Sequence, residues 1–244
     1  MKIVDAYWEK RNLGLDCVEI SIELSDTATE FESRLKNIDA PYTVVKVPSN
    51  KSDILFNMTE LGFTFVETLL NYVHNLKSIE LTGIHKRLDN AIYYEKMNDN
   101  DFTQLYKEMQ TGIFKTDRIS LDPFFSCEIA AQRYLNWIRD EIARDTAIYK
   151  VCYKKDSIGF FTFKETDKDI YYPFLAGLYS KYNQSGLGMY IIQKTREECV
   201  KRQAKGISTY VSSNNISVIK VHNMLRYTFN KINYIFVKHN NQEA

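Results

Sequence analysis

The chain has 244 residues, with 32 Lys plus Arg against 31 Asp plus Glu and a net charge of +1. This balance argues against a surface that binds nucleic acid or anionic lipid over its whole extent, and 44% hydrophobic residues exclude a disordered chain. At about 150 residues per domain, the length predicts one large domain or two modest lobes.

The four cysteines, Cys17, Cys127, Cys152 and Cys199, stand far apart, without a CxxC motif or a closely spaced Cys/His pair. This spacing predicts no metal site. The N-terminus lacks the apolar core of a signal peptide, and no stretch reaches the roughly 18 apolar residues of a membrane span. We therefore expect a cytoplasmic protein with no membrane span, no metal and no nucleic-acid partner.

The first 76 residues predict a βαβαβ unit. Apolar and polar residues alternate in its first strand, and the next helix opens with capping residues and carries Phe31, Leu35 and Ile38 at helical spacing. Gly62 stops the second helix. The expected elements are a strand at 17–24, a helix at 25–38, a strand at 42–49, a helix at 52–62 and a strand at 63–76.

Residues 77–90 show no core pattern, so we place a boundary there and expect two lobes, 1–85 and 86–244. Beyond it, amphipathic helices alternate with β-rich segments, which predicts a second α/β lobe. The expected elements are a helix at 101–113, a loop at 117–125, a helix at 126–144, a hairpin of strands at 146–153 and 157–165, a strand at 169–180, a helix at 188–204, a strand at 206–214, a helix at 215–227 and a strand at 232–239.

The two lobes show signs of an internal repeat. Both end in a helix, a turn and a strand, and LGFTF (61–65) matches LRYTF (225–229) at three of five positions. Together with the order of elements, this predicts two related lobes, each a mixed sheet flanked by helices.

The segment 169–188 is the most informative one. A strand runs into KYNQSGLG, and Gly186 and Gly188 stand where a helix begins. Glycines there let the backbone approach a ligand, and the free N–H groups of a first helical turn attract anions such as a pyrophosphate. The alternative is a strand-to-helix turn that merely needs glycine. A dinucleotide site is disfavoured because the third glycine of GxGxxG is missing, and a P-loop is excluded because no GK[ST] follows.

NQSGLG (183–188) resembles the [Q/R]-x-x-G-x-[G/A] loop of the GCN5-related N-acetyltransferases (GNATs), which bind acetyl-CoA. The strand, Asn215 and the helix that follow also resemble that family, over roughly 90–244. Asn183 stands where the family usually has Gln or Arg, and LRY (225–227) replaces a common LGF. The resemblance implies an α/β GNAT fold, a mixed twisted sheet flanked by helices.

Two further segments resemble the two-lobed members of the dTDP-fucosamine acetyltransferase type. LGFTFVE (61–67) matches the LGFxxVE that ends their partial N-terminal lobe, and FKTDRISLDPFF (114–125) with the following RYLNWI matches their F-x-x-x-R segment and the helix after it. This likeness implies direct transfer of an acetyl group from acetyl-CoA to the amine of a nucleotide-activated, dTDP-linked deoxyamino sugar.

The resemblance also implies roles for single residues in cofactor binding. The strand at 169–180 is expected to splay from the strand at 206–214 and to offer backbone groups of Gly177, Leu178 and Ser180 to the pantetheine arm. Asn215 is expected to bind the cofactor arm, with a simple helix N-cap as the alternative. The residues expected to hold the pyrophosphate are Asn183, Gln184, Ser185, Gly186, Leu187 and Gly188.

Two residues are expected to carry protons. Glu67 matches the proposed general base of the sugar-acetylating members, and burial among apolar neighbours raises the pKa of such a carboxyl. His222 stands where the family has a Tyr that protonates the leaving thiolate. The alternatives are a solvent-exposed carboxylate for Glu67 and a surface or core histidine for His222. Cys199 has no His or Asp partner on its predicted helix, which disfavours a covalent acetyl-cysteine route.

The acceptor is expected to contact Phe114, Arg118, Asp122 and Tyr134, where an Arg could bind a phosphate and an aromatic ring could stack on a base or sugar. The alternative is an Arg118–Asp122 pair that stitches the loop. Other readings stay open for the whole chain: acetylation of another small amine or peptide, an inactive module that binds acetyl-CoA, and a homodimer as its assembly.

Overall fold

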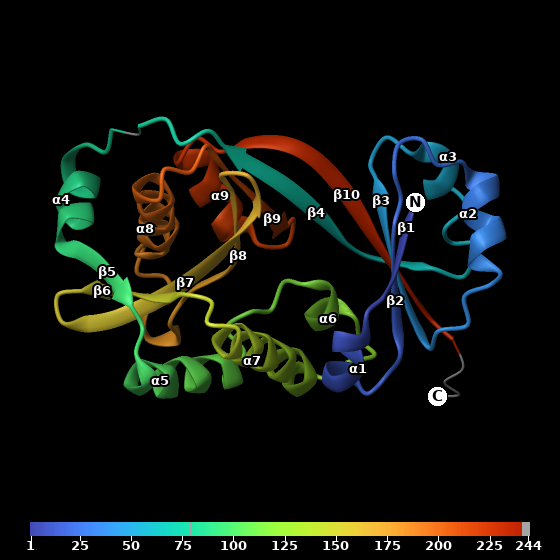
Figure 1. Ribbon diagram of the computed structural model, residues 1–244, viewed down its shortest axis with the longest axis horizontal. Helices are drawn as coiled ribbons and strands as arrows, with labels where there is room; N and C mark the ends of the chain where they lie inside the picture. The colour runs from blue at the N-terminus through green and yellow to red at the C-terminus, as the bar shows by residue number, and fades with distance from the viewer. Residues whose placement is uncertain (79, 241–244) are drawn as a thin grey trace.

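The computed structural model describes residues 1–78 and 80–240, which form a ten-stranded mixed sheet with helices on both faces (Figure 1). The strands are β1 (Lys2–Asp5), β2 (Cys17–Ser21), β3 (Tyr42–Pro48), β4 (Thr64–His74), β5 (Ile92–Lys96), β6 (Ile148–Tyr153), β7 (Asp156–Asp167), β8 (Ile170–Leu178), β9 (Gly206–Ser212) and β10 (Thr228–His239). The helices are α1 (Tyr7–Leu13), α2 (Ala28–Leu35), α3 (Ser52–Leu55), α4 (Gly83–Ala91), α5 (Asp99–Gln110), α6 (Arg118–Leu121), α7 (Cys127–Ala143), α8 (Gly188–Lys201) and α9 (Ile216–Met224), with a 3₁₀ turn η1 (Ser180–Tyr182).

The predicted lobes share one sheet, where we expected a separate sheet for each. The strand order is β1-β2-β3-β10-β4-β9-β8-β7-β6-β5, so β10 pairs with β3 and β4, while β4 pairs with β10 and β9. The last strand of each half is therefore inserted beside the other half, and these two long strands span the molecule in Figure 1. Because each of these two strands is inserted between two others, both edges of β4 and of β10 form sheet hydrogen bonds and neither strand is an exposed edge of the sheet.

The order of elements repeats between the halves, in line with the likeness of LGFTF and LRYTF. The series β2-α2-β3-α3-β4 corresponds to β8-α8-β9-α9-β10, and the two series meet at the antiparallel pair of β4 and β10. The parallel pairs β2/β3 and β8/β9 hold equivalent places on the two sides of this centre.

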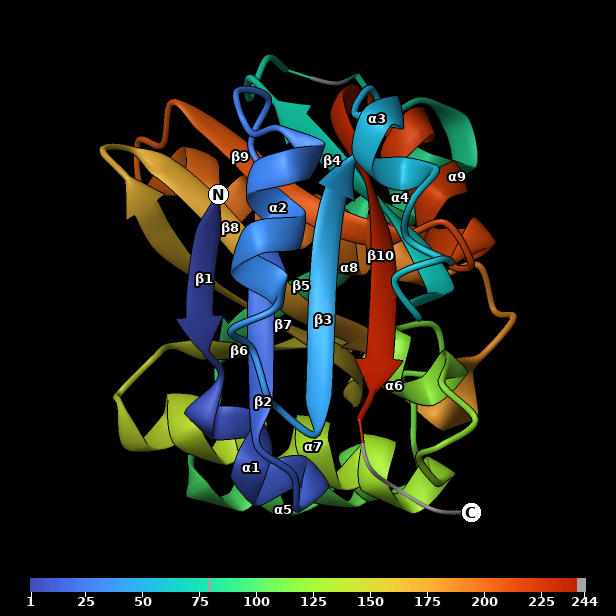
Figure 2. The same cartoon turned by 90° about the vertical axis from the view of Figure 1, so that its right-hand side faces the viewer.

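The helices bury four apolar clusters against the sheet. Figure 2 shows α2 and α3 over the outer face of the N-terminal half, where Phe31 and Ile54 pack on Val45. On the opposite face α5 and α7 lie under the C-terminal half, and Leu105 and Leu135 are buried there. Since α7 also reaches α1 and α6, this face joins the two halves.

Several elements escaped the sequence analysis because they bury little. Helix α4 buries no residue, β5 buries only Ile92, and α1 buries only Glu9 and Leu13. The expected loop at 117–125 contains the short helix α6, and the helix expected at 52–62 ends at Leu55 and continues as turns. The last strand starts at Thr228, because its first residues pair with the end of β4.

Among the described residues, no helix is long and apolar enough to cross a membrane. All four cysteines are free thiols; Cys17, Cys152 and Cys199 are buried, and Cys127 is exposed.

Candidate functional site

The site begins where β8 and β9 part. These parallel strands are in register only at Ile170↔Gly206 and Tyr171↔Ile207. Beyond that point β8 remains paired with β7 as far as Gly159↔Leu178. On its other edge the Thr209 hydroxyl still donates to the carbonyl of Pro173 at 2.8 Å, but no strand of the described chain pairs with the rest of that edge. The predicted splay is thus confirmed, and it leaves the backbone around Ala176 and Gly177 open on the side of β9.

Gly177 lies where the chain packs unusually closely. A Cβ atom there would lie 3.1 Å from the side chain of Ile113 and 3.4 Å from that of Phe114, and a Cβ at Gly159 would collide with the carbonyl of Gly177. The α5–α6 connection is therefore pressed against β8 at the point where β9 has left. Glycine is needed at this position for close packing, since no positive φ is involved.

The loop between β8 and α8 has both engaged and free amides. Gln184 and Gly186 adopt positive φ values of 64° and 78°. Helix α8 starts at Gly188 with no side-chain cap. Three loop amides donate within the loop: those of Asn183, Ser185 and Leu187. The amides that find no acceptor in the described part of the chain include those of Gly186, Gly188 and Met189. Free N–H groups at the N-terminus of a helix attract anions, and α8 has 14 residues. The predicted role of this loop in binding a pyrophosphate stays a prediction.

Ser180 differs from the expectation. Its amide and its hydroxyl both donate to Glu108 Oε2 on α5, each at 2.9 Å. The amide of Ser180 is therefore not free for a cofactor, because η1 turns it away from the parted strands and towards α5.

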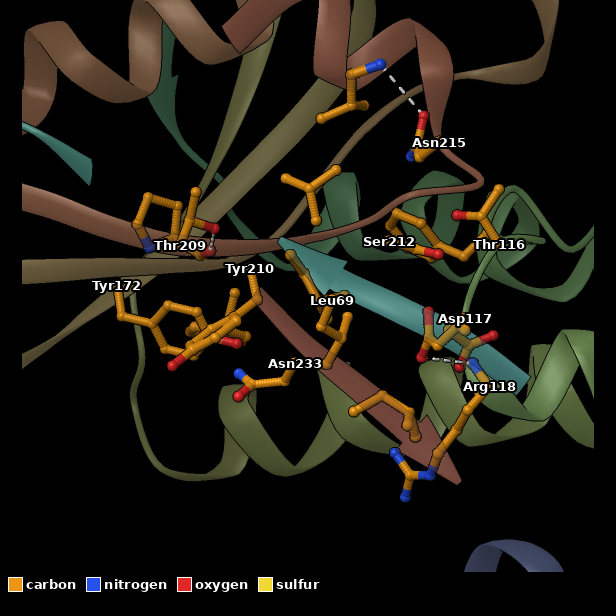
Figure 3. Close-up of a pocket in the computed structure, with 18 of the residues that line it drawn as sticks. Leu69, Thr116, Asp117, Arg118, Tyr172, Thr209, Tyr210, Ser212, Asn215 and Asn233 are labelled. Carbon is orange, nitrogen blue, oxygen red and sulfur yellow. Dashed lines mark hydrogen bonds between the residues drawn. The ribbon is translucent and has the colours of Figure 1, made fainter. Parts of the chain in front are cut away.

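A cavity of about 740 Å³ lies between the parted strands and the N-terminal half (Figure 3). Its size falls within the roughly 300–1,000 Å³ that is usual for ligand sites. Its wall contains six of the predicted site residues: Glu67, Phe114, Arg118, Tyr134, Asn215 and His222. Gly177, Leu178, Ser180, Asp122 and the loop 183–188 lie outside this wall.

Glu67 is a buried carboxyl group on β4 with one unused oxygen. Its Oε1 accepts the backbone amide of Arg118 at 3.0 Å, and its Oε2 has no hydrogen-bond partner among the described residues. Burial raises the pKa of Glu67 to about 7. The nearby Ser212 hydroxyl and Arg118 lower this pKa, and Asp117 raises it, but burial has the largest effect. The group can therefore hold or release a proton near neutral pH, as a general base must.

Arg118 positions Glu67 through its backbone, while its side chain points elsewhere. The guanidinium Nη2 donates to Glu9 at 2.8 Å and to Glu19 at 2.9 Å. Burial alone would raise the pKa of Glu19, but attraction by Arg118 and Lys46 lowers it to about 2. The guanidinium expected to bind a phosphate is thus engaged by two buried carboxylates, which fix α6 to α1 and β2.

Asp122 also differs from both readings made from the sequence. Its Oδ2 lies 2.8 Å from Nε2 of His239 at the end of β10, and its Oδ1 accepts the amide of Phe124. Asp122 neither pairs with Arg118 nor reaches the cavity. This contact ties the segment after α6 to β10 and so helps to place the loop that carries Arg118.

The predicted aromatic pair of the acceptor site does line the cavity. The rings of Phe114 and Tyr134 lie 4.6 Å apart between centroids. Next to them Trp137 stacks on Phe174 at 5.4 Å and 20°. Phe114 therefore lies between Gly177 and the cavity.

His222 is buried beside the aromatic rings of Tyr72 and Tyr227. Its Nδ1 lies 2.9 Å from the carbonyl oxygen of Val218, so Nδ1 carries the hydrogen and the neutral ring has an unprotonated Nε2. Burial lowers the pKa of His222 to about 4. At neutral pH the ring is uncharged, which makes it a poor proton donor to a thiolate.

Asn215 caps α9, because its Oδ1 accepts the amide of Val218 at 3.2 Å. It also borders the cavity, so the cap and a contact with a ligand are compatible (Figure 3). The same helix turn thus carries Asn215 and places Val218, whose carbonyl orients His222.

The sequence analysis missed much of the cavity wall. Figure 3 shows Tyr172 and Tyr210 at one end and Thr116, Asp117 and Ser212 at the other. On β9 the exposed Tyr210 stands between the buried Thr209 and Val211, and neighbouring residues of a strand lie on opposite faces. That pattern could identify the face, but only the sheet order shows what it faces.

No protein-family model and no curated protein sequence matches this chain. Among solved structures, a GCN5-related N-acetyltransferase from Sphaerobacter thermophilus superposes with a TM-score of 0.61 at 10% identity, over 87% of this chain and 66% of that one. A GCN5-related N-acetyltransferase from Kribbella flavida gives 0.56 at 8% identity, over 93% and 82%. A tandem GNAT protein from the clavulanic acid biosynthesis pathway gives 0.51 at 9% identity, over 89% and 69%.

These comparisons confirm the predicted fold. The chain has the α/β fold of the GCN5-related N-acetyltransferases, and it spans just under two thirds of the Sphaerobacter protein. At such low identities the likeness concerns the fold alone. The dTDP-fucosamine acetyltransferase type, the boundary between 1–85 and 86–244, and the roles of single residues stay predictions.

Proposed function

We propose that the protein is an acetyl-CoA-dependent N-acetyltransferase that acts on the amine of a nucleotide-activated, dTDP-linked deoxyamino sugar. One observation carries the proposal: the parted strands β8 and β9 adjoin a cavity whose wall holds a buried carboxyl group with a free oxygen. The opening between β8 and β9 would hold the cofactor, and Glu67 in the cavity wall would accept a proton.

The residues present fit acetyl-CoA. The amides of Gly186, Gly188 and Met189 would hold the pyrophosphate, and the open edge of β8 at Gly177 and Leu178 would bind the pantetheine arm. Asn215 would contact the arm from the start of α9. When bound, acetyl-CoA supplies an activated acetyl group for attack by an amine.

The acceptor amine must lose a proton before it can attack. Glu67 would take that proton at Oε2, while the amide of Arg118 holds Oε1 in place. The carboxyl group is half ionised near neutral pH because burial raises its pKa to about 7. A proton taken by Glu67 leaves the carboxyl neutral, which its buried site favours.

His222 was our candidate for the acid that protonates the leaving thiolate. Its neutral ring, with Nδ1 committed to Val218, does not support this role. In the present proposal Glu67 keeps the role of base, and His222 serves to shape the cavity wall next to Asn215.

The test is thiol release from acetyl-CoA in the presence of a panel of dTDP- and UDP-linked amino sugars, with free amino sugars, a polyamine and a peptide amine for comparison. We expect turnover with a nucleotide-linked amino sugar and its loss in Glu67→Gln. Glu60→Gln, an exposed carboxylate of the same half, is the matched control. Thermal stabilisation by coenzyme A without turnover on any amine would show an inactive binding module instead.

A further inference from the structure

An ion-pair network lies along the wall of the main cavity, the one with a volume of about 740 Å³. The network joins three cations to three carboxylates: Arg118, Arg133 and Lys46 to Glu9, Glu19 and Asp117. Its contacts measure 2.6–2.9 Å, apart from the one between Arg133 and Asp117, which measures 3.4 Å. The charges of this network therefore balance without a contribution from Glu67.

Glu67 adds a fourth carboxyl group beside the network. The residue is 4% exposed, and its Oε2 has no hydrogen-bond partner among the described residues. Arg118 gives it a backbone amide at 3.0 Å, while the guanidinium group of that arginine is engaged by Glu9 and Glu19. An ionised Glu67 thus leaves the cluster one cation short, and a buried charge without a partner is costly.

The other described groups around Glu67 do not supply that cation. Ser212 on β9 has a neutral hydroxyl, and the residue opposite Glu67 on β10 is apolar. On α7, burial raises the pKa of the Tyr134 phenol well above its usual value. Asp117 and Glu67 raise this pKa further, although Arg133 lowers it. Two carboxyl groups therefore act on the same phenol, and Figure 3 shows Asp117 and Ser212 at one end of the cavity.

Asp117 has room for a ligand. Its side chain lines the cavity and is 20% exposed. Oδ1 accepts the amide of Ser120 at 3.1 Å, and Oδ2 lies 3.4 Å from Arg133, which Glu9 holds more closely through three contacts of 2.6–3.0 Å. Since a carboxylate oxygen can accept about two hydrogen bonds, Asp117 can bind a further donor. It directly precedes the amide that Glu67 accepts, so such a donor lies near Glu67.

We propose that Asp117 binds the acceptor amine as its primary ammonium ion and holds it beside Glu67, so that the site selects a charged amine. The inference rests on the proposed function and adds a positioning residue to it. One N–H of the ammonium group donates to Asp117. A second N–H bond breaks, its proton forms an O–H bond with Oε2 of Glu67, and its electron pair stays on nitrogen for attack on the thioester. The transfer leaves a neutral carboxyl group, which restores the charge balance of the network.

Glu67 itself reports whether an ammonium ion binds. The full chain, labelled with ¹³C at the glutamate carboxyl groups, is titrated with pH by NMR, and the Glu67 signal is the one lost in Glu67→Gln. Methylammonium chloride should lower the midpoint, which lies near pH 7, by about one unit or more, because a bound cation favours the ionised carboxyl group. Potassium chloride at the same concentration should leave the midpoint nearly unchanged. In Asp117→Asn, methylammonium should have no larger effect than potassium.

The kinetics of Asp117→Asn and Asp117→Ser test the same role. Both variants keep a side chain that can cap α6 and remove the charge. The rise of kcat/KM with pH should begin at lower pH, because Asp117 no longer raises the pKa of Glu67. KM for the acceptor amine should rise about 10- to 150-fold, the loss expected for one hydrogen bond to a charged group, with kcat nearly unchanged.

Asp140→Asn is the matched control, because it breaks a pair with Arg11 on α7 outside the main cavity and should change neither KM nor the pH profile. Thermal melting and coenzyme A binding check that each variant is folded.

Two results would overturn the inference: a midpoint shift that is no larger in methylammonium than in potassium chloride, or an Asp117→Asn enzyme with the KM and the pH profile of the wild type. If Glu67→Gln is then still inactive, Asp117 has no positioning role and acetyl transfer stands. If none of the amines is acetylated, the proposed function fails, and the NMR titration alone decides whether the site holds an ammonium ion.

Discussion

The parallel pairs β2/β3 and β8/β9 hold equivalent places in the two halves, yet one is closed and the other is open. Strands β2 and β3 are in register over five pairs, from Cys17↔Tyr42 to Ser21↔Lys46, whereas β8 and β9 share two. Backbone groups that form sheet hydrogen bonds between β2 and β3 are thus left without a strand partner between β8 and β9. In the proposed function, the pantetheine arm would bind in the opening between β8 and β9, and the paired strands β2 and β3 offer no equivalent opening.

The helices that follow β2 and β8 also differ: the N-terminus of α2 is capped by side chains, and that of α8 is not. Helix α2 starts with a capping box, in which Thr27 accepts the amide of Glu30 and the Glu30 carboxylate accepts the amide of Thr27. Helix α8 starts without a side-chain cap. A carboxylate of the chain itself thus occupies in α2 the place that an anionic ligand could take in α8. The comparison teaches that the same structural unit is closed by its own side chains and strand pairing in the first half and leaves backbone groups free in the second.

The largest effect is expected from replacing Glu67, the proposed proton acceptor of the main cavity. Glu67→Gln should lower kcat/KM about 10²–10⁴-fold, the usual contribution of a general base. For the wild type, kcat/KM should rise with pH through about 7, since the base must be ionised. The variant should lose this rise. A variant with the same pH–rate profile as the wild type would remove Glu67 from the mechanism.

The same variant should be more stable than the wild type at alkaline pH. The folded pKa of about 7 lies above the roughly 4.3 of an unfolded Glu, so the folded state binds the extra proton between these values. Stability of the wild type therefore falls as the pH rises through this window. Glu67→Gln should melt higher at about pH 8 and show no gain at about pH 4. An equal Tm difference at both values would contradict the raised pKa.

The next largest effect is expected at Gly186, and Gly62 in the other half serves as its comparison because the two glycines have similar φ angles. Gly186 has φ 78° in the loop before α8, and Gly62 has φ 80° in the N-terminal half. Alanine in this region costs about 1–2 kcal/mol. Gly186→Ala should weaken coenzyme A binding by about tenfold if that strain falls on the bound loop. Gly62→Ala should lower stability similarly and leave the affinity unchanged; equal losses of affinity would argue against the loop as the binding site.

A smaller effect is expected at His222. Because the neutral ring is a poor proton donor at pH 7, His222→Gln should reduce kcat less than about tenfold, against the roughly 10²–10⁴-fold expected for loss of an acid. Asn223→Gln, on the same helix turn, is the control for helix packing. A hundred-fold loss confined to His222→Gln would restore the role of acid.

The smallest effect concerns the closed half. Thr27→Ala removes the cap of α2 and should cost about 0.5–2 kcal/mol of stability. It should not create a second site for coenzyme A, because β2 and β3 remain paired. Calorimetric titration of the variant should give the same stoichiometry as the wild type. A second binding event would show that the cap alone keeps the first half closed.

Much of the open half could be predicted from local sequence. Three features are each encoded by a few consecutive residues: the strand that ends near Leu178, the turn with Gly186 and Gly188, and the cap at Asn215. The helix α1 could not be found in this way, because it buries only two of its seven residues. The destination of the Arg118 guanidinium was equally out of reach, since its partners lie 109 and 99 residues away.

By itself, the sequence determined the α/β class, the order of most elements, the loop that can bind an anion and the candidacy of Glu67, because these depend on periodicity, on glycine and on short motifs. Only the tertiary structure decided that β4 and β10 are exchanged between the halves, that Glu67 Oε2 is buried without a hydrogen-bond partner among the described residues, and that Trp8 and Trp137, from different halves, line the same cavity. These features depend on pairings between distant segments, and the free energy of such pairings comes from burial and sheet hydrogen bonds that no local pattern contains.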